Sequence, residues 1–324
     1  MEFRTPVHIP PIHQPLDHRR KGLLLGSCFT EHMGQRMLEA KLPVTINPFG
    51  ILFNPASIAS TLDRLSHPQP FTEQDLIAQG DLWVSLAHHG RFSSTDRSET
   101  LSAINQALEQ GAEALARADY LILTLGTAWV YLWKATGTVV ANCHKLPASA
   151  FERRRLTPEE IVTDLERALI PHLAHKQILL TVSPVRHAGD GLVENQLSKA
   201  SLIVAAATLC ERHPAAISYF PAYEILMDEL RDYRFYQADM MHPSEVARQY
   251  IWERFAETRL TPACRALIAR IEALHTAMRH RPLNPHSETH RTFCTRMKAE
   301  AERLQQEAPF LDFTPEITHF TVDR

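Results

Sequence analysis

The sequence lacks the features that mark a disulfide-stabilised, zinc-bound or membrane-spanning protein. Its five cysteines are scattered, odd in number and never spaced as Cys-x-x-Cys, which argues against a disulfide framework and a structural zinc site. No stretch approaches the roughly 18 consecutive apolar residues of a transmembrane helix. The formal net charge of -3 gives no broad electrostatic reason to bind nucleic acid or an anionic membrane surface. We therefore expect no nucleic-acid partner, no integral membrane segment, and reduced thiols in the cytoplasm.

Histidine is plentiful, but no metal-binding pattern gathers it. None of the 18 histidines stands in a His-Glu-x-x-His arrangement, and we expect neither a metal nor an organic cofactor. The adjacent His88 and His89 would point to opposite faces of a strand, which predicts surface or packing roles. Residues 1–21 are rich in Pro, His and Arg, contain no apolar core of signal-peptide length, and are predicted to form an extended arm.

The chain is organised around Gly22–Thr30, Gly-Leu-Leu-Leu-Gly-Ser-Cys-Phe-Thr. The leucines suit a short buried parallel strand, and Gly26 suits the tight turn that follows it. A helix is predicted over Glu31–Ala40, which leaves Ser27 and Cys28 between the end of a strand and the start of a helix. Backbone N–H groups and the helix dipole favour negative charge there, so we expect a lowered thiol pKa. Ser27 as a simple helix cap is the alternative interpretation.

Short apolar runs alternate with helical patterns up to residue 259, which predicts one doubly wound, mostly parallel α/β domain over residues 22–259. Within it, Phe71–Thr100 is predicted to be irregular, Tyr223–Leu230 to be a short helix, and Thr136-Gly137 to turn a hairpin. Beyond residue 259, charged helical patterns predict a helical appendage over residues 260–324. Its role is open between wrapping the domain, covering the site and mediating homo-oligomerisation.

Functional side chains of such a sheet gather at the carboxyl ends of its strands. That rule brings together five segments: Ser27-Cys28, Asn47–Gly50, Gly126–Trp129, Ser183–His187 and Asp239–His242. In the last of these, His242 is placed to take a proton from a nucleophile while Asp239 orients its ring. The pattern predicts nucleophilic catalysis with a His–Asp pair.

Six segments carry a resemblance to a known family: Gly26-Ser27-Cys28-Phe29-Thr30, Asn47-Pro48-Phe49-Gly50, Leu125-Gly126-Thr127-Ala128-Trp129, Ala141-Asn142-Cys143-His144-Lys145, Ser183-Pro184-Val185-Arg186-His187 and Asp239–His242. In this order they resemble the GSCFA family, which is related to the SGNH (GDSL-type) hydrolases. The resemblance runs from about Lys21 to Phe255. It implies a flavodoxin-like sheet and an esterase, lipase, acyl hydrolase or carbohydrate deacetylase.

The resemblance also implies roles for single residues. It makes His242 the base, Asp239 its orienter and Gly50 a backbone donor to the oxyanion. Aligned on glycine, the Gly-Asp-Ser-Leu-Thr signature puts Cys28 at the nucleophile position, with the two following residues also in place. A shift of one residue would make Ser27 the nucleophile and Cys28 a small buried hydrophobe.

The third sequence motif of the SGNH pattern, here called the third block, differs in this chain. SGNH enzymes carry Gly-x-Asn there, whereas this chain has Gly126-Thr127-Ala128 and no amide. Because one lost oxyanion donor typically costs about 10²–10³ in rate, we expect a replacement. The candidates are Asn47, Asn142 and His144. Elsewhere, Arg186 and His187 are candidates to bind a substrate oxygen or to anchor a loop, and Cys143 is a minor rival nucleophile.

These observations predict an SGNH-like hydrolase that acts on an ester, an acyl or acetyl ester of a carbohydrate or lipid, through an acyl-enzyme on Cys28 or Ser27. An acyltransferase to a hydroxyl acceptor is one alternative, because a dry site under a lid of the C-terminal helices would favour transfer. A catalytically inactive carbohydrate- or ligand-binding protein of the same fold is the other.

Overall fold

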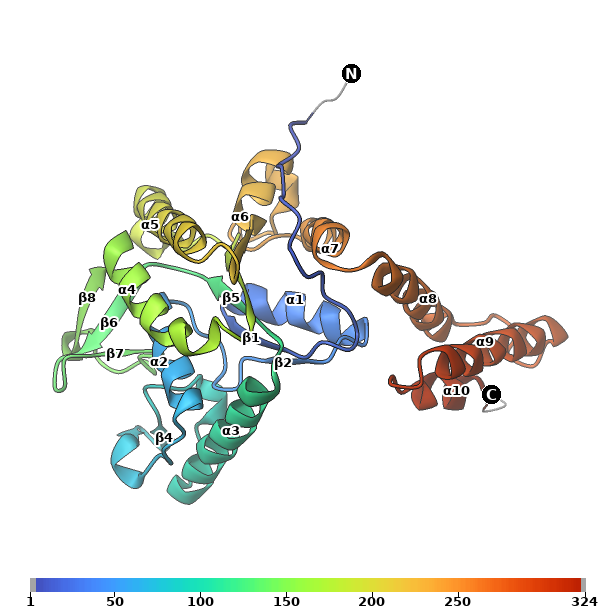
Figure 1. Cartoon of the computed structure of the whole chain (residues 1–324). Helices are drawn as coiled ribbons and strands as arrows, with labels where there is room; N and C mark the ends of the chain where they lie inside the picture. The colour runs from blue at the N-terminus through green and yellow to red at the C-terminus, as the bar shows by residue number, and fades with distance from the viewer. Residues whose placement is uncertain (1–3, 322–324) are drawn as a thin grey trace.

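The computed structural model describes residues 4–321 and centres on a five-stranded parallel sheet (Figure 1). Its strands are β1 (Gly22–Gly26), β2 (Val44–Ile46), β5 (Tyr120–Leu125), β9 (Gln177–Val182) and β10 (Ile217–Phe220). They lie in the order β10-β9-β5-β1-β2, which is the 2-1-3-4-5 order of doubly wound sheets of the flavodoxin type. The expected α/β fold with a parallel central sheet is confirmed.

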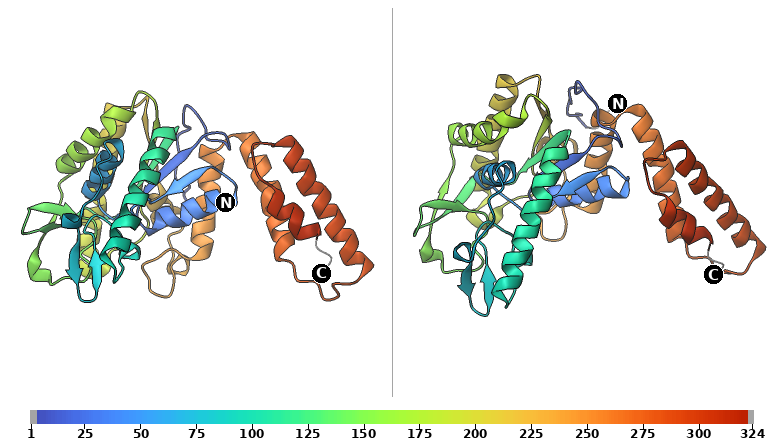
Figure 2. Two further views of the ribbon diagram at one scale, coloured as in Figure 1. Left: turned by 90° about the horizontal axis from the view of Figure 1, so that it is seen from below. Right: turned by 60° about the horizontal axis from the view of Figure 1, so that its bottom comes forward.

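Alternating side chains of β1 divide the interior into two cores. Leu23 and Leu25 pack with one set of helices, whereas Leu24 packs with the other. The first set is α2 (Pro55–Ser66), α3 (Arg97–Arg117), α4 (Pro158–Leu169) and α5 (Leu192–Arg212). The second set is α1 (Cys28–Glu39) and α7 (Glu245–Arg259) (Figure 2). Because β1 is buried on both faces, it is a continuous apolar run rather than an alternating one.

Two small antiparallel sheets accompany the main sheet. One pairs β3 (Ile77–Gln79) with β4 (Leu82–Val84), and the other has β6 (Trp129–Trp133) between β7 (Thr138–Val140) and β8 (Phe151–Arg155). The predicted hairpin is confirmed, since Gly137 turns between β6 and β7 at a φ of 69°. The irregular stretch predicted over Phe71–Thr100 is wrong, because it contains β3, β4 and the start of α3. Strands of three residues are too short to give a recognisable period.

The helix predicted over Tyr223–Leu230 is only partly α-helical. It begins as α6 (Ala222–Glu224) and continues as a π-helical turn, η6 (Ile225–Glu229). Residues 4–21 run along this part of the body, where the Val7 N–H donates to Glu229 at 2.7 Å and Leu16 bridges Leu260. Residues 1–3 of the predicted arm lie outside the described residues.

The C-terminal helices are α8 (Pro262–Arg279), α9 (Glu288–Glu307) and α10 (Thr314–Thr321), and they project from the α/β body (Figure 2). They share a core of their own that includes Ile271, Leu304 and Phe313. They contact the body through the first turns of α8, whose Cys264 and Ile268 pack in the second core, and through Lys41, whose Nζ lies 2.9 Å from Glu316 Oε1 and 4.9 Å from the ring centroid of Phe313. Within residues 4–321, no helix is long and apolar enough to span a membrane.

Candidate active site

The turn between β1 and α1 places Ser27 and Cys28 at the carboxyl edge of the sheet. Gly26 enters it at a φ of 146°, where a Cβ would lie 2.3 Å from the Thr124 carbonyl oxygen, so the turn requires glycine. Ser27 is buried and caps α1, since its Oγ accepts the Phe29 N–H at 3.3 Å. Cys28 is half-buried and is the first residue of the helix. Of the two nucleophile candidates, Ser27 is the helix cap and is buried, whereas Cys28 is only half-buried.

The Cys28 thiol does not have the lowered pKa that its place at a helix N-terminus predicts. Burial raises its pKa, and the negative charge of Glu31 adds to the rise. The N–H groups of Phe29 and of Cys28 itself, with the positive charge of Lys199, act in the opposite direction. Desolvation of the thiolate outweighs the favourable helix terminus. Such a thiol is mostly protonated at neutral pH and needs a base to become a nucleophile.

Asp239 and His242 form a base–orienter pair in the turn before α7. His242 Nδ1 lies 2.6 Å from Asp239 Oδ2, while Asp239 Oδ1 accepts the N–H groups of Met241 at 2.9 Å and of His242 at 3.0 Å. The bonds from the His242 N–H, the Met241 N–H and the His242 ring hold the pKa of Asp239 down to about 2. Among residues 4–321, Nε2 of His242 takes part in no hydrogen bond, so it is the ring nitrogen open to a reacting group.

His242 is one of several charges that act on two histidines of this edge. Burial lowers the pKa of His32, which stands four residues after Cys28 on the same face of α1, and the charges of Arg248 and His242 contribute. Burial also lowers the pKa of His187, which follows β9, and the charges of Lys199 and His242 contribute. No hydrogen bond in the described part of the chain joins the Cys28 thiol to His242. Catalytic hydrogen bonds are often long without substrate and tighten when it binds.

Lys199 of α5 belongs to this site, and the motifs do not identify it. The residue is 1 % exposed, and its Nζ donates to the carbonyls of Gly126 and Ser183 at 2.7 Å each. Burial lowers its pKa to about 7, against the opposing effect of Cys28. The available signal was periodicity, because Lys199 stands three residues before Leu202 on the buried stripe of the helix.

Gly50, the predicted oxyanion donor, does not present a free N–H. Its N–H donates to the Asn47 carbonyl at 2.8 Å, and at its φ of 84° a Cβ would lie 2.2 Å from His89 Cβ. Asn47 is buried at a φ of 44°, and its Oδ1 accepts the Gly26 N–H at 2.8 Å, whereas its Nδ2 has no hydrogen-bond partner among residues 4–321. Both residues therefore shape the turn after β2 and hold the end of β1.

Gly126 and Thr127 likewise use their backbone donors within the fold. Both N–H groups donate to the Phe53 carbonyl, at 2.9 and 2.8 Å. A Cβ on Gly126 would lie 2.7 Å from that carbonyl oxygen and 3.3 Å from Ser27 Cβ, so glycine permits the close approach. The Thr127 Oγ1 lies 3.1 Å from Ser198 Oγ. Of the backbone groups considered, the N–H of Cys28 at the start of α1 is the best placed oxyanion donor.

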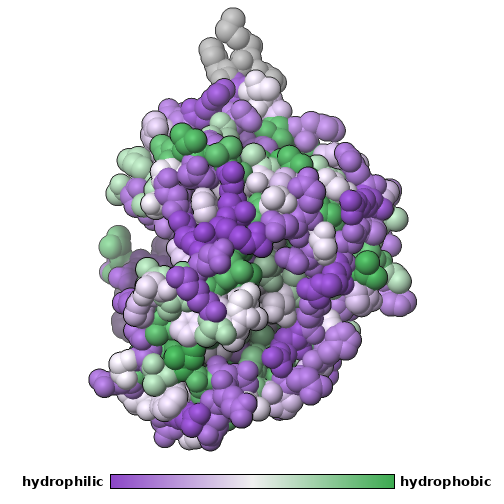
Figure 3. Space-filling model, turned by 90° about the vertical axis from the view of Figure 1, so that its left-hand side faces the viewer, coloured by the Kyte–Doolittle hydropathy of each residue, from purple (hydrophilic) through white to green (hydrophobic). Residues whose placement is uncertain are grey.

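A pocket of about 500 Å³ opens beside these groups, and we call it the Trp129 pocket. Its lining includes Thr127, Trp129, Tyr131, Asn142, His187 and Met241. Thr127, His187 and Met241 connect it with Lys199 and His242. The face of the molecule that carries β6, β7 and β8 is mainly hydrophilic, with apolar residues in small separate groups (Figure 3). The pocket therefore offers aromatic and polar walls rather than a broad apolar surface.

Arg186 acts as a loop anchor in this structure. Its N–H donates to the Met241 carbonyl at 3.1 Å, and its Nη1 donates to the Met240 carbonyl at 3.4 Å. Its guanidinium lies 4.1 Å from the ring centroid of Tyr236. Arg186 thus holds the turn that carries His242, which was one of the two roles expected for it.

His187 presents a neutral ring to the Trp129 pocket. Burial, together with the charges of Lys199 and His242, lowers its pKa to about 4. Its backbone N–H donates to Asn195 at 2.9 Å, which fixes the start of the loop after β9. Near neutral pH the ring is uncharged and can donate or accept one hydrogen bond.

Asn142, Cys143 and His144 lie in the loop after β7. Asn142 and Cys143 line the Trp129 pocket, and burial raises the pKa of the Cys143 thiol. The His144 Nε2 lies 2.7 Å from the Ser85 carbonyl oxygen, so its ring is engaged by the loop after β4. Of the three candidates for the missing amide, Asn142 is the one that the structure brings to the pocket.

His88 and His89 lie in the turn after β4, so the expected geometry of opposite strand faces does not apply. His88 is fully buried, and its ring centroid lies 4.4 Å from that of Phe49 and 4.8 Å from that of Phe71. Its Nδ1 lies 2.8 Å from Ser85 Oγ, and burial lowers its pKa to about 3. His88 is thus a packed core residue. Within residues 4–321, no three His, Cys, Asp or Glu side chains are grouped to hold a metal ion.

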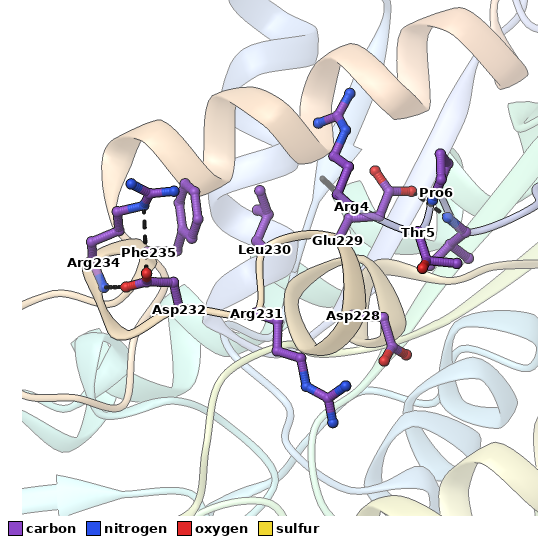
Figure 4. Close-up of a pocket in the computed structure, with 11 residues that line it drawn as sticks. Arg4, Thr5, Pro6, Asp228, Glu229, Leu230, Arg231, Asp232, Arg234 and Phe235 are labelled. Atoms are coloured by element: carbon purple, nitrogen blue, oxygen red, sulfur yellow. Dashed lines mark hydrogen bonds and ion pairs between the residues drawn. The ribbon is translucent and has the colours of Figure 1, made fainter. Parts of the chain in front are cut away.

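A second hollow, of about 990 Å³, lies between residues 4–7 and the segment 228–235 (Figure 4). Its lining contains no histidine, cysteine or serine. Several of its charged groups have partners within the fold, since Glu229 accepts the Val7 N–H and Asp232 accepts the Arg234 N–H at 2.9 Å. The lining of the Trp129 pocket, in contrast, includes His89, Cys143 and His187 and reaches the His242 turn at Met241, although Cys28 and His242 do not themselves line it.

The C-terminal helices do not cover this site. Cys28 begins α1, whereas Lys41, which contacts α10, follows the end of the same helix. A helix of 12 residues is about 18 Å long, so Cys28 and the contact between Lys41 and α10 lie at opposite ends of α1. Figure 1 shows α8–α10 on the opposite side of the body from β6–β8. Of the roles left open for these helices, covering the site is excluded.

Comparison with known families gives two matches. The model of the GSCFA family matches residues 21–255, which include all the segments gathered at the sheet edge. The model described as "GSCFA domain protein, C-terminal domain" matches residues 271–322, which correspond to most of the helical bundle. No curated protein matches the chain.

Proposed function

The chain belongs to the GSCFA family, and from that premise we propose that it hydrolyses O-acyl esters of carbohydrates through an acyl-thioester on Cys28. The main observation in support of this proposal is the Asp239–His242 pair. Asp239 holds His242 by Nδ1 at 2.6 Å, at the sheet edge where α1 begins with Cys28. A thiol, a base and an orienter are the three parts of a nucleophilic acyl-transfer site.

The proposed reaction has two steps. In the first, Cys28 Sγ forms a bond to the ester carbonyl carbon while His242 Nε2 takes the thiol proton. Collapse of the tetrahedral intermediate breaks the ester C–O bond, and His242 returns the proton to the leaving hydroxyl. In the second, His242 takes a proton from water, which attacks the thioester carbonyl and releases a carboxylic acid. The Cys28 thiol regains its proton from His242.

The environment of each group fits its proposed part. Because burial raises the Cys28 pKa, the thiol needs the base at the moment of attack rather than standing as a thiolate beforehand. Asp239, with its pKa near 2, stays ionised and stabilises the imidazolium that forms. The N–H groups at the start of α1 and the helix dipole favour the negative charge on the carbonyl oxygen.

The relation to SGNH hydrolases is part of the same proposal. The 2-1-3-4-5 strand order and an Asp-x-x-His turn before a late helix support it. Two features set the chain apart from the superfamily pattern: a thiol at the nucleophile position and the absence of an amide at Ala128. Asn142, on the wall of the Trp129 pocket, is the substitute that we propose for that amide.

The Trp129 pocket supports a carbohydrate rather than a long-chain lipid. Trp129 and Tyr131 contribute aromatic rings, each with one face covered by the Arg153 guanidinium at 4.4 and 5.1 Å from the ring centroid, and Asn142 and His187 contribute hydrogen-bonding groups. A sugar ring presents both apolar C–H faces and hydroxyl groups, so this mixture suits it. A long acyl chain would need a continuous apolar channel.

A hydrolysis assay with matched variants tests the proposal. Purified protein is incubated with p-nitrophenyl acetate and with acetylated monosaccharides, and acetate release is measured for the wild type, C28A and H242A. We expect release to be lost in both variants and kept in C210A, which removes a cysteine of α5 outside the site. Loss in S27A but not in C28A would make Ser27 the nucleophile.

Two other outcomes identify the alternative functions. Formation of a new ester with an added alcohol, in excess over hydrolysis, would identify an acyltransferase. Binding of the acetylated sugar without any turnover would identify a non-catalytic binding protein. Preferential cleavage of a lipid ester would show that the substrates are lipid esters rather than carbohydrate esters.

A further inference from the structure

Lys199 is a buried cation without a buried anion beside it. Its two hydrogen-bond partners are neutral carbonyls, and the ring centroid of Tyr223 lies 5.7 Å from its Nζ. Within residues 4–321, no carboxylate forms an ion pair with it. Burying an ammonium without a counter-charge is costly, and an apolar side chain of similar length would fill the same space without that cost. The charge therefore calls for an explanation beyond packing.

Cys28 is the ionisable group through which the Lys199 charge can act. Gly126, whose carbonyl accepts the Lys199 ammonium, abuts the β1–α1 turn, because a Cβ on it would lie 3.3 Å from Ser27 Cβ. Burial raises the pKa of Cys28 and lowers that of Lys199, and the charge of each residue opposes the effect of burial on the other.

The other groups around this pair do not take the place of Cys28. Glu31 of α1 acts against the thiolate, and His187 after β9 is a neutral ring whose pKa Lys199 lowers further. Tyr223 has its pKa raised by burial and stays a neutral phenol.

The geometry also connects Lys199 to the sheet edge. Gly126 follows β5 and Ser183 follows β9, and the Lys199 ammonium bonds to the carbonyl of each. Both turns lie on the same side of the β1–α1 turn, that of β5 next to it and that of β9 one strand further, because β5 lies between β1 and β9 in the sheet. One ammonium group thus joins two neighbouring turns and acts electrostatically on the thiol of the third.

We infer that Lys199 is a positioning residue for Cys28: its ammonium holds the turns after β5 and β9 together and stabilises the thiolate as the thiol proton leaves. It forms no covalent bond, and the proton goes to His242 as in the proposed reaction. Lys199 thereby supplies positive potential at an edge where the third-block amide is absent. The inference rests on Cys28 as the proposed nucleophile, but its test measures the thiol itself rather than turnover.

The pH dependence separates this role from a purely structural one. Because burial lowers the pKa of Lys199 to about 7, a thiolate formed below that pH should lie near an ammonium, whereas one formed well above it should lie near a neutral amine. Loss of Lys199 should therefore slow thiolate chemistry at low pH and leave it almost unchanged at high pH. A side chain that only supports the turns would change the rate by the same factor at every pH.

Alkylation of Cys28 by iodoacetamide, mapped by mass spectrometry over a range of pH, measures this difference. We expect K199M to react about tenfold more slowly than the wild type near pH 6, which corresponds to one pKa unit, and at nearly the same rate near pH 9. Cys143 in the same samples is the internal reference. A ratio that is independent of pH, or equal rates throughout, would overturn the inference.

Arg259 of α7 provides a matched control. It is also 1 % exposed, and its guanidinium donates to the carbonyls of Pro10, Thr258 and Tyr219. R259M should lower stability while leaving the pH profile of Cys28 alkylation unchanged. A profile altered in R259M as in K199M would show a general effect of losing a buried cation, and would contradict the proposed role of Lys199.

A second measurement covers the case in which K199M does not fold. C28D and C28N place a carboxylate or a neutral amide of similar shape at the thiol position, and ¹³C NMR of the lysine ε-carbon follows Lys199. We expect the titration midpoint to be about one unit higher in C28D than in C28N. Equal midpoints would overturn the inference. Coupling observed in a protein without esterase activity would support the inference and contradict the proposed function.

Discussion

The Nδ1 atom of His242 lies 2.6 Å from Oδ2 of Asp239, and both residues belong to one four-residue turn. The same carboxylate accepts two backbone N–H groups of that turn through Oδ1. Met240 adopts a φ of 58°, an uncommon conformation for a residue with a Cβ, as the turn closes. The orientation of the base is thus set locally, and Arg186 fixes the turn against the end of β9.

Replacing Asp239 with Asn should reduce turnover without unfolding the protein. The amide can still accept from the turn, but it carries no charge to stabilise the imidazolium and can favour the wrong ring tautomer. We expect kcat for ester hydrolysis to fall about 10²–10⁴-fold, with a much smaller change in KM. D232N is the matched control, because Asp232 caps a nearby turn without contacting His242. Equal kcat values for D239N and the wild type would contradict the role of Asp239.

Ser27 should prove to be a structural cap. Its Oγ accepts the Phe29 N–H, so S27A should lower the free energy of unfolding by about 1 kcal/mol. Alkylation of Cys28 and ester turnover should both persist in the folded variant. Chemical denaturation measures the first effect, and iodoacetamide mapping with the hydrolysis assay measures the second. Lost turnover in a stably folded S27A protein would instead favour Ser27 as the nucleophile.

Most of the fold could be predicted from the sequence because its elements are long or strongly marked. β5 and β9 are six-residue, mostly apolar runs, and α4 begins at a Thr-Pro-Glu-Glu capping box formed by Thr157 and Glu160. The predictions fail where the local pattern is too short. β3 and β4 have three residues each, and η6 departs from the α-helical period that its sequence suggests.

The candidate site was predictable only where motifs mark it. The β1–α1 turn and the Asp239–His242 turn carry their chemistry in adjacent residues, and the sheet topology brings their segments to one edge. Lys199 has no motif, and its burial depends on how closely α5 packs on the sheet. The prediction of a lowered Cys28 pKa was wrong because it used only the position of the thiol at a helix N-terminus. Desolvation, which raises the pKa, depends on the whole environment of Cys28.

Gly50 and Gly137 both adopt positive φ, but they should respond differently to alanine. At Gly137, where a Cβ would have no neighbour within 4 Å, G137A should cost about 1–2 kcal/mol of backbone strain. At Gly50 the Cβ would also collide with His89, so G50A should cost more and displace the turn that holds the end of β1. Denaturant unfolding of the two variants tests the difference. Equal costs would show that His89 moves away freely.

The protein should lose stability as the pH falls below about 6.5. Burial lowers the pKa of His88 from 6.5 to about 3 and contributes to lowering that of His187 to about 4. The unfolded chain therefore binds protons that the folded chain does not, and each histidine removes about 1.4 kcal/mol per pH unit between its unfolded and folded pKa. Unfolding free energies measured between about pH 7 and 4 should show this slope, and H88F should reduce it. An unchanged slope in H88F would contradict the burial of a neutral His88 ring.

The most direct test of the proposed function is to trap the acyl-enzyme. The protein is mixed with p-nitrophenyl acetate, quenched in acid within seconds, and mapped by peptide mass spectrometry. The account predicts one acetyl group on Cys28, sensitive to hydroxylamine and absent in C28S and H242A at neutral pH. An acetyl group on Ser27, or no adduct on the β1–α1 turn while ester is consumed, would contradict a Cys28 nucleophile.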